Sequence, residues 1–345
     1  MGSAAAIMAI AERADAARAE AAERWEASVP GAGSLESWVR RFQDAGRATL
    51  NFHPDRLSRS GRTVAAGLAA DGAYRSQWIT GISAGSRSAI RGGERHRFER
   101  DFFAGAYGDV HPSAGEHPVY GSFDLLFDDH GGSPRFGSSF VVVGPHLRER
   151  ATICLGDSHA RPRDVGTFAE PSSILAGLAE QASRHELLDR GLGPDVLLRA
   201  LAGTYRSGRA SRDLDGYVEI QVHGGVSLAD DVEAIVLDPS FRGSAVERDV
   251  TTAAQRYGFE LAWHRGSELH ADDVPADFRG PTMPLLARRV ARRDGFVDAR
   301  AIGVAAAREK FEEPNELGDP PASTLQQLKY LWHTLLAHGS DATEP

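Results

Sequence analysis

Two side chains that could do chemistry stand two residues apart in a short apolar segment. Residues 217–223 read YVEIQVH, and this alternation is typical of a β-strand. Successive strand side chains point to opposite faces. Glu219 and Gln221 are therefore expected on one polar face, with the branched residues on the other. That polar face could line a cleft, where a carboxylate and an amide would hold a substrate, or it could simply meet water.

A second stretch brings together groups that bind flat rings and polar ligands. Residues 74–83 read YRSQWITGIS. Such a loop could stack an aromatic ring and hydrogen-bond an amide or a phosphate. A buried loop with structural side chains would have the same composition, so both interpretations stay open.

Serine hydrolase chemistry is an alternative, because Gly81-Ile82-Ser83-Ala84-Gly85 matches the G-x-S-x-G pattern. A nucleophile elbow needs a strand before the serine and a long helix after it. Residues 75–80 could form the strand, but two glycines at 92–93 follow too soon for the helix. A Gly-Ser turn that exposes backbone N–H groups fits the segment better.

The histidines and the cysteine do not indicate a metal centre. There are 13 histidines, but none stands in an H-E-x-x-H motif or a close Cys/His pair, so loop and surface histidines are expected. Cys154 is the only cysteine and can form neither an internal disulfide nor a multi-cysteine site. The sequence Asp157-Ser158-His159 holds triad residue types, yet consecutive residues cannot face one another as a triad requires. We expect a polar loop there that could border a cleft.

The composition describes an ordinary globular chain. It has 345 residues, of which 25% are charged and 41% hydrophobic, enough for a sizeable core. The net charge of −9 disfavours nucleic-acid binding, which needs surplus positive charge. No apolar run reaches the roughly 18 residues of a membrane span, and residues 1–10 lack the basic start of a Sec signal peptide. We expect a cytosolic protein, or one secreted into a host cytosol without a cleaved signal peptide.

Helices are expected before and after a strand-rich middle. Alanine-rich residues 4–28 and a helix capped by Ser34 predict a helical lead-in over 1–47. Strands are expected at 48–53, 120–127, 140–143, 151–155, 217–223, 232–237 and 259–263, and helices at 173–182, 196–201, 245–257 and 323–337. The fold class is therefore α+β. We expect a catalytic core over 48–245, a mainly helical part over 246–338 packed on it, and a frayed tail over 339–345.

Several longer motifs resemble one bacterial family. They lie at residues 50–56, 74–83, 92–95, 120–121, 133–138, 156–159 and 217–224. Over about residues 48–245 the chain is similar to the CteC-like family of bacterial effector ADP-ribosyltransferases, formerly known only as a domain of unknown function. The resemblance implies an ADP-ribosyltransferase-like split mixed β-sheet core that grips NAD, flanked by N- and C-terminal helices.

The resemblance also implies roles for individual residues. Glu219 is the catalytic carboxylate, which stabilises positive charge on the ribose, and Gln221 positions the acceptor. Tyr74 and Tyr107 sandwich the nicotinamide ring. The pyrophosphate is held by Arg56, Arg75 or Arg135, and the remaining cofactor-binding residues are Asn51, His53, Gln77, Thr80, Gly81, Ser83 and Ser138. NAD serves as co-substrate, and no metal is required.

The expected activity is mono-ADP-ribosyl transfer from NAD to a protein side chain, with release of nicotinamide. The resemblance makes a threonine of ubiquitin the expected acceptor. An NAD glycohydrolase that uses the same pocket, or a serine hydrolase acting through Ser83, is the first alternative. A non-catalytic protein-interaction module is the second. A protein substrate is the expected partner, with no nucleic acid and no membrane.

Overall fold

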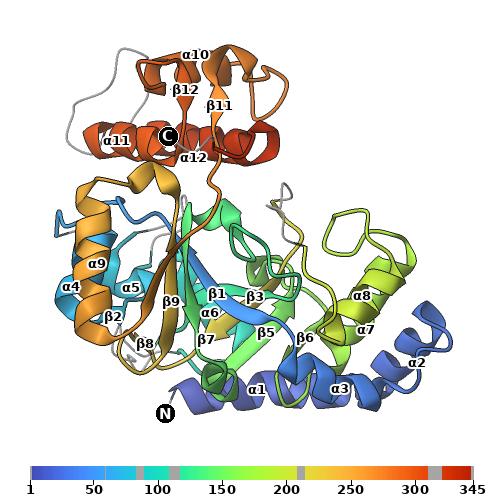
Figure 1. Cartoon of the computed structure of the whole chain (residues 1–345). Coiled ribbons are helices and arrows are strands. Elements are labelled where there is room, and N and C mark those ends of the chain that lie inside the picture. Colours follow the sequence, from blue (N-terminus) through green and yellow to red (C-terminus); the bar gives the residue numbers. More distant parts are fainter. Residues whose placement is uncertain are drawn as a thin grey trace.

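A computed structural model describes residues 2–58, 60–82, 89–108, 117–207, 214–309 and 321–342. A large twisted sheet forms its centre, helices pack around the sheet, and a group of C-terminal helices lies over one end (Figure 1). The predicted mixed α+β class is therefore confirmed. In the described part of the chain, no helix is both long and apolar enough to cross a bilayer.

The elements follow the chain closely. The helices are α1 (Gly2–Ala16), α2 (Arg18–Ser28), α3 (Leu35–Asp44), α4 (Val64–Asp71), α5 (Gln77–Thr80), α6 (Glu94–Phe102), α7 (Ser172–Ser183), α8 (Pro194–Leu201), α9 (Ala245–Tyr257), α10 (Met283–Val290), α11 (Ala299–Glu309) and α12 (Pro321–His338). The strands are β1 (Arg47–Phe52), β2 (Ala73–Tyr74), β3 (Val119–Asp124), β4 (Ser139–Val143), β5 (Ala151–Leu155), β6 (Val165–Thr167), β7 (Val218–Val222), β8 (Val226–Ser227), β9 (Val232–Leu237), β10 (Glu260–Trp263), β11 (Leu269–His270) and β12 (Phe296–Val297).

The large sheet has eight strands in the order β10-β9-β4-β1-β3-β7-β5-β6. Only β9 and β10 are parallel neighbours, and α9 connects them. Hydrogen bonding runs unbroken across the sheet, whereas the resemblance predicted a split one. The β9–β10 pair places residues up to 263 in this sheet, so the C-terminal part begins later than expected.

The two faces of the sheet differ in chemistry. One face carries the apolar side chains of β1, β4, β7 and β9, such as Leu50 and Ile220, and packs on α2, α3, α7 and α9 in the main core. The other face carries a row of polar side chains. Register pairs Thr49 with Ser122, and Ser122 with Glu219. Directly opposite residues of antiparallel strands share a face, so a polar row crosses the middle of the sheet.

The N-terminal helices are part of the core. Trp25 on α2 has no exposed surface, and its indole N–H donates to the Gly33 carbonyl over 3.0 Å. Arg24 pairs with Asp164 and with Glu180 at 2.8 and 2.7 Å, which joins α2 to β6 and α7. The lead-in expected over 1–47 is therefore packed against the sheet and its helices.

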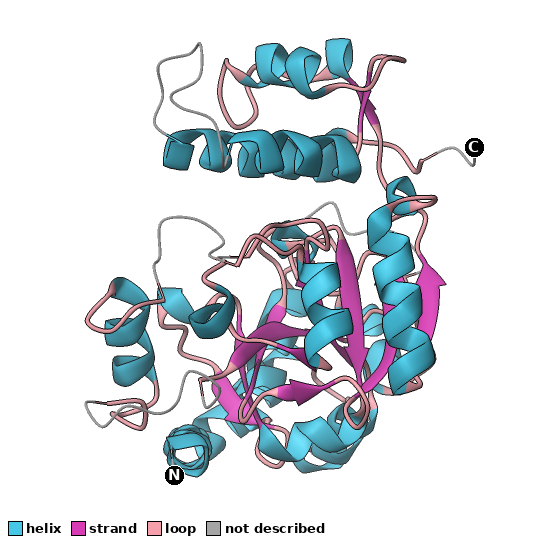
Figure 2. Ribbon diagram, turned by 90° about the vertical axis from the view of Figure 1, so that its left-hand side faces the viewer, coloured by secondary structure: helices cyan, strands magenta, loops and turns pink. Residues whose placement is uncertain are grey.

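The C-terminal cap, residues 269–338, contains the β11–β12 ribbon and α10 to α12. Figure 2 shows α12 lying across the end of the core, with loops beneath it. The Trp332 indole N–H donates to the Pro134 carbonyl over 2.9 Å. On α11, a Cβ at Gly303 would lie 1.6 Å from Asp55 Oδ2. Glycine at this position therefore lets the helix approach the end of β1.

Two local predictions were wrong. Residues 75–80, considered as a strand, contain the short helix α5. Its residues pair with no strand, and Gly81 ends the helix in the left-handed conformation. The helix expected over 4–28 is interrupted at Ala17, where α1 ends and α2 begins.

Candidate active site

A cleft of about 1110 Å³ opens between the polar face of the sheet and the cap. Its walls come from the ends of β1 and β3, the 73–82 segment, the turn at 157–159, and helices α11 and α12. Of the residues expected at the site, the cleft is lined by Asn51, His53, Arg56, Tyr74, Arg75, Gln77, Thr80, Gly81, Arg135 and Glu219. The cleft is large enough for a ligand of dinucleotide size.

Glu219 reaches the cleft from the polar face of β7, although only 5% of it is exposed. Its Oε1 accepts a hydrogen bond from Gln221 Nε2 at 2.8 Å, and the Ser158 backbone N–H lies 3.5 Å from Oε2. Burial, together with the charge of Asp157, raises the pKa of the Glu219 carboxyl to about 7, against the hydrogen bonds that lower it. A carboxylate with this pKa can change its charge near neutrality.

Gln221 has no exposed surface and does not line the cleft. It therefore cannot contact an acceptor directly, contrary to the role expected for it. Its amide is the last link of a hydrogen-bonded chain. Tyr107 OH lies 2.6 Å from His223 Nδ1, His223 Nε2 lies 3.0 Å from Thr152 Oγ1, and that hydroxyl donates to Gln221 Oε1 over 2.6 Å.

The protons of this chain can be assigned without conflict. Burial lowers the pKa of His223 to about 3, so its ring is neutral. Thr152 donates to Gln221, so its oxygen accepts from His223 Nε2–H, and Nδ1 accepts from Tyr107. In every hydrogen bond of the chain the donor is then the group farther from Glu219, and the last bond donates to its carboxylate. The alternation over 217–223 predicted that Glu219, Gln221 and His223 share a face of the strand. Nothing in the sequence indicated that Tyr107 and Thr152 complete the hydrogen-bonded chain.

Tyr107 therefore lies elsewhere than predicted. It has no exposed surface and packs edge-on against Phe103, with ring centroids 5.4 Å apart. The ring belongs to a second apolar cluster, which includes Ile10, Phe98 and Phe102 and is stabilised by the loss of water from its surface. His117 and His223 are stacked on the ring with centroids 5.2 and 6.0 Å away, so no face is left to stack on a nicotinamide. Ser138 is also buried outside the cleft lining. Ser83 lies outside the described residues.

Arg56 lines the cleft and forms no ion pair with a carboxylate of the described residues. Among the described residues, no carboxylate oxygen lies within 4 Å of its guanidinium nitrogens, in contrast to Arg75, whose Nε is 3.8 Å from Asp71. Burial lowers the pKa of Arg56, and the neighbouring Asp55 opposes this effect. An arginine held in a cleft without a counter-ion can bind an anion from solution. Arg135 pairs with Asp215, but its buried Nε has no hydrogen-bond partner.

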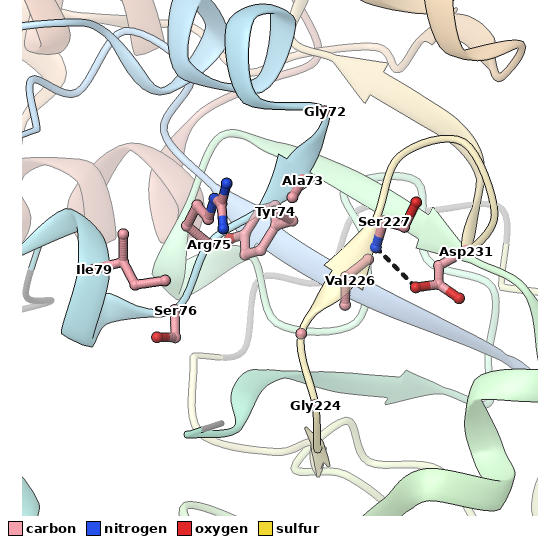
Figure 3. A pocket seen from close by; sticks show the side chains of 11 residues that line it. Gly72, Ala73, Tyr74, Arg75, Ser76, Ile79, Gly224, Val226, Ser227 and Asp231 are labelled. Atoms are coloured by element: carbon pink, nitrogen blue, oxygen red, sulfur yellow. Dashed lines mark hydrogen bonds between the residues drawn. The ribbon is translucent and has the colours of Figure 1, made fainter. Parts of the chain in front are cut away.

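The 73–76 segment forms a wall shared by two hollows. It lines the cleft and also a smaller pocket of about 380 Å³, which is closed on its other side by 224–227 and Asp231 (Figure 3). Tyr74 pairs with Val226 in the β2–β8 ladder, and its ring lies edge-on to Phe52, with centroids 5.8 Å apart. Burial raises the pKa of the Tyr74 hydroxyl. The loop predicted to bind the ligand is thus anchored at its start.

A buried carboxylate that we did not predict supports the same wall. Glu99 on α6 has no exposed surface and accepts from Trp78 Nε1 at 3.2 Å and Tyr120 OH at 3.0 Å. His117 Nδ1 lies 2.6 Å from it, and Arg95 pairs with it at 3.6 Å. The glutamate therefore joins α5, α6 and β3. Its position in an otherwise ordinary helix sequence gave no signal.

The turn at 157–159 completes the site beside Glu219. Asp157, Ser158 and His159 all line the cleft, and Asp157 Oδ1 accepts the His159 backbone N–H over 2.9 Å. This bond stabilises a turn, and it joins the Asp157 side chain to a backbone N–H and not to the imidazole ring that a triad requires. The expected polar loop is confirmed in this position.

Among the residues that the structure describes, Asp129, His130 and His264 form one group with metal-ligand side chains. Both histidines lie in loops, as expected for loop and surface histidines, but they are buried and not at the surface. His264 Nε2 donates to the Ser138 carbonyl over 2.7 Å, and its Nδ1 accepts the Gly266 N–H over 2.9 Å. Both ring nitrogens of His264 therefore have backbone partners and link the loop to the strand, whereas His130 bonds only through Nε2, which donates to the Gly266 carbonyl, and its buried Nδ1 has no partner among the described residues.

Comparison with known proteins adds two findings. Over 128 residues the chain is 27% identical to the Gene 2 protein of Mycobacterium phage L5. That alignment covers 34% of this chain and 44% of the phage protein, so it spans less than half of either. The model of the family described as "Protein of unknown function (DUF3626)" matches residues 47–338, a stretch that contains the whole cleft lining. The chain therefore belongs to the DUF3626 family.

Proposed function

We propose that this protein is a mono-ADP-ribosyltransferase that uses NAD as co-substrate. The observation that carries the proposal is that a carboxylate of raised pKa, Glu219, and Arg56, an arginine with no ion pair among the described residues, face the same large cleft. Breaking the nicotinamide–ribose bond needs negative charge near the ribose. Holding the pyrophosphate needs positive charge farther along the ligand. The resemblance described above supports the same assignment.

The chemistry follows from the placement of Glu219. The bond between ribose C1′ and the nicotinamide nitrogen breaks, and its electron pair leaves with neutral nicotinamide. Positive charge develops on the ribose, and the ionised carboxylate opposes it in a water-poor site. The acceptor oxygen then bonds to C1′, and its proton passes to a base or to water. The Ser158 N–H and Gln221 amide orient the carboxylate throughout.

The acceptor is proposed from the resemblance, as a threonine of ubiquitin. The Asp157–His159 turn and Tyr120 lie on the cleft wall next to Glu219, where an acceptor side chain would enter. Water in place of the acceptor would give NAD glycohydrolase activity at the same site. The two outcomes differ only in what attacks C1′.

The experiment is incubation of the protein with NAD and ubiquitin, followed by intact-mass analysis of ubiquitin and assay of free nicotinamide. We expect one ADP-ribose on ubiquitin. Glu219→Gln should reduce transfer by a factor on the order of 10² to 10³ with little change in NAD affinity, because the charge it opposes exists mainly in the transition state. Glu260→Gln, on the exposed surface of β10, is the matched control. Normal transfer by folded Glu219→Gln protein, or no nicotinamide release by the wild type, would refute the proposal.

A further inference from the structure

The end of the cleft beneath the cap differs in chemistry from the end at Glu219. Around Glu219 the walls are polar, with Asp157, Ser158 and Tyr120. Beneath the cap, α11 contributes Ile302 and Ala306, and α12 contributes Leu325, Leu328 and Trp332. These aliphatic and aromatic side chains form an apolar surface inside the cleft, and Gln326, Lys329 and Tyr330 of α12 border it. Such a surface binds a flat, weakly polar ring by excluding water from both.

One short segment connects the two ends. In the 3₁₀ turn η1 (Pro134–Phe136), the Phe136 ring lies 5.8 Å from that of Tyr217, which precedes β7. The Pro134 carbonyl of the same turn accepts the Trp332 indole N–H from α12. Arg135, between them in sequence, lines the cleft. The turn therefore lies between the Glu219 end and the cap end, and it carries a cation at that middle position.

The cationic groups fit this order. Arg56 lines the cleft three residues after His53, whose ring meets Trp332 edge-on, with centroids 5.3 Å apart. Arg56 thus lies near the cap and has no acidic partner among the described residues. The buried Nε of Arg135 also has no hydrogen-bond partner. The cleft accordingly presents, in sequence, a carboxylate end, two guanidinium groups, of which that of Arg135 keeps one buried donor without a described partner, and an apolar end.

We infer that the adenosine half of the dinucleotide binds beneath the cap, with its adenine against the apolar faces of α11 and α12. This inference rests on the proposed function, which fixes the nicotinamide–ribose bond at Glu219. The pyrophosphate then lies at Arg56 and Arg135, and the remaining half of the ligand extends to the cap. The cap is thereby a ligand-binding part of the protein and determines which nucleotide is accepted.

The test fills the space beneath the cap and measures binding of each half of the ligand separately. Ala307 is half-buried on α11 and lines the cleft, so Ala307→Trp places a large ring in it. The control is Val304→Trp, on the same helix at a position that is 44% exposed and outside the cleft lining. Binding of AMP, nicotinamide mononucleotide and NAD is measured by calorimetry, with a melting curve for each variant.

We expect Ala307→Trp to weaken AMP and NAD by at least about 10-fold through steric exclusion, with nicotinamide mononucleotide unchanged and Val304→Trp like the wild type. If Ala307→Trp fails to fold, Leu325→Asp tests the same wall by placing a charge where adenine would lie. The inference is overturned if a folded variant binds AMP as the wild type does, or if AMP and nicotinamide mononucleotide are weakened equally. The proposed function is unaffected by either result as long as the wild type turns over NAD. Absence of NAD binding to the wild type would instead refute the proposed function.

Discussion

Gln221 Nε2 lies 2.8 Å from Glu219 Oε1, so the amide donates to the carboxylate from within the same strand face. This hydrogen bond favours the ionised carboxylate and lowers its pKa. Behind the amide stand Thr152, His223 and Tyr107, each bonded to the next. The glutamate in the cleft is thus oriented by groups that never contact a ligand.

The first prediction concerns this hydrogen bond. Gln221→Leu removes the donor, so the pKa of Glu219 should rise above its value of about 7. Nicotinamide release near neutral pH should fall, and the midpoint of its pH profile should move upward by about one unit. The matched control is Thr152→Val, which leaves the Gln221–Glu219 bond in place and should move the midpoint less. An unmoved midpoint in Gln221→Leu would show that the amide does not control the carboxylate.

The second prediction concerns stability and pH at Glu219. The folded-state pKa of about 7 exceeds the ordinary value of 4.5, so the folded protein holds a proton that the unfolded chain releases. This contribution is fully present below pH 4.5 and is lost as the pH rises through 7. Relative to Glu219→Gln, the unfolding free energy of the wild type should decrease by up to about 3 kcal/mol across that window.

Denaturant melts of the two proteins at several pH values between the two limits check this. A constant difference between wild type and variant would mean that Glu219 is ionised as easily in the fold as in water. We expect activity to rise through pH 7 because Glu219 ionises there, and a constant difference would remove that reason.

The third prediction separates the two tyrosines. Tyr107→Phe removes the hydroxyl that bonds to His223 in a fully buried site and should lower the unfolding free energy by about 1 to 3 kcal/mol. Its NAD affinity should match the wild type, because the ring is outside the cleft. Tyr74→Ala, on the cleft wall, should weaken NAD binding. Calorimetry measures the NAD affinity of both variants. Weaker NAD binding by Tyr107→Phe, with unchanged binding by Tyr74→Ala, would indicate that Tyr107 and not Tyr74 contacts the ligand.

The fourth prediction concerns the N-terminal helices, which precede the matched region 47–338. Trp25 is fully buried in the main core, so Trp25→Ala should cost about 3 to 5 kcal/mol. A chain that begins at residue 47 should fail to fold cooperatively. Circular dichroism melts measure both effects. Trp38→Ala, at a half-buried position on α3, is the control and should cost clearly less.

The fifth prediction concerns Cys154. It has no exposed surface, and burial followed by the charge of Glu219 raises its pKa well above the ordinary value. The native protein should therefore resist alkylation by iodoacetamide, and Cys154→Ala should retain activity. Mass spectrometry of native and denatured samples gives the result directly. Rapid labelling of the native protein would contradict the structure.

Periodicity predicted much of the fold. Strands with alternating or continuous apolar residues, such as 140–143 and 217–223, lie where the sequence indicated, because burial of one face sets their register. The short helix over 77–80 was missed, since four residues give no period to read. The helix expected over 245–257 was placed correctly, and the structure caps it with Ser244 and ends it at Gly258.

The site was less accessible to sequence reasoning. Residues near strand ends converge on the cleft because sheet topology joins them, and the motifs at 50–56 and 74–83 indicated most of them. Gln221 and Tyr107 were assigned direct contacts from the resemblance and from their residue types. Whether a polar side chain faces a ligand or another buried polar group depends on long-range packing, as the separation of 116 residues between Tyr107 and His223 illustrates.

The η1 turn has a consequence for selectivity by length. It contacts Tyr217 at one end and Trp332 at the other through only three residues, so the span between Glu219 and the cap is set by one short turn of backbone. A mononucleotide can reach one end or the other but not both, and it forfeits the binding energy of the end it leaves. The protein should therefore distinguish dinucleotides from their halves by molecular length, before any particular base or ring is recognised.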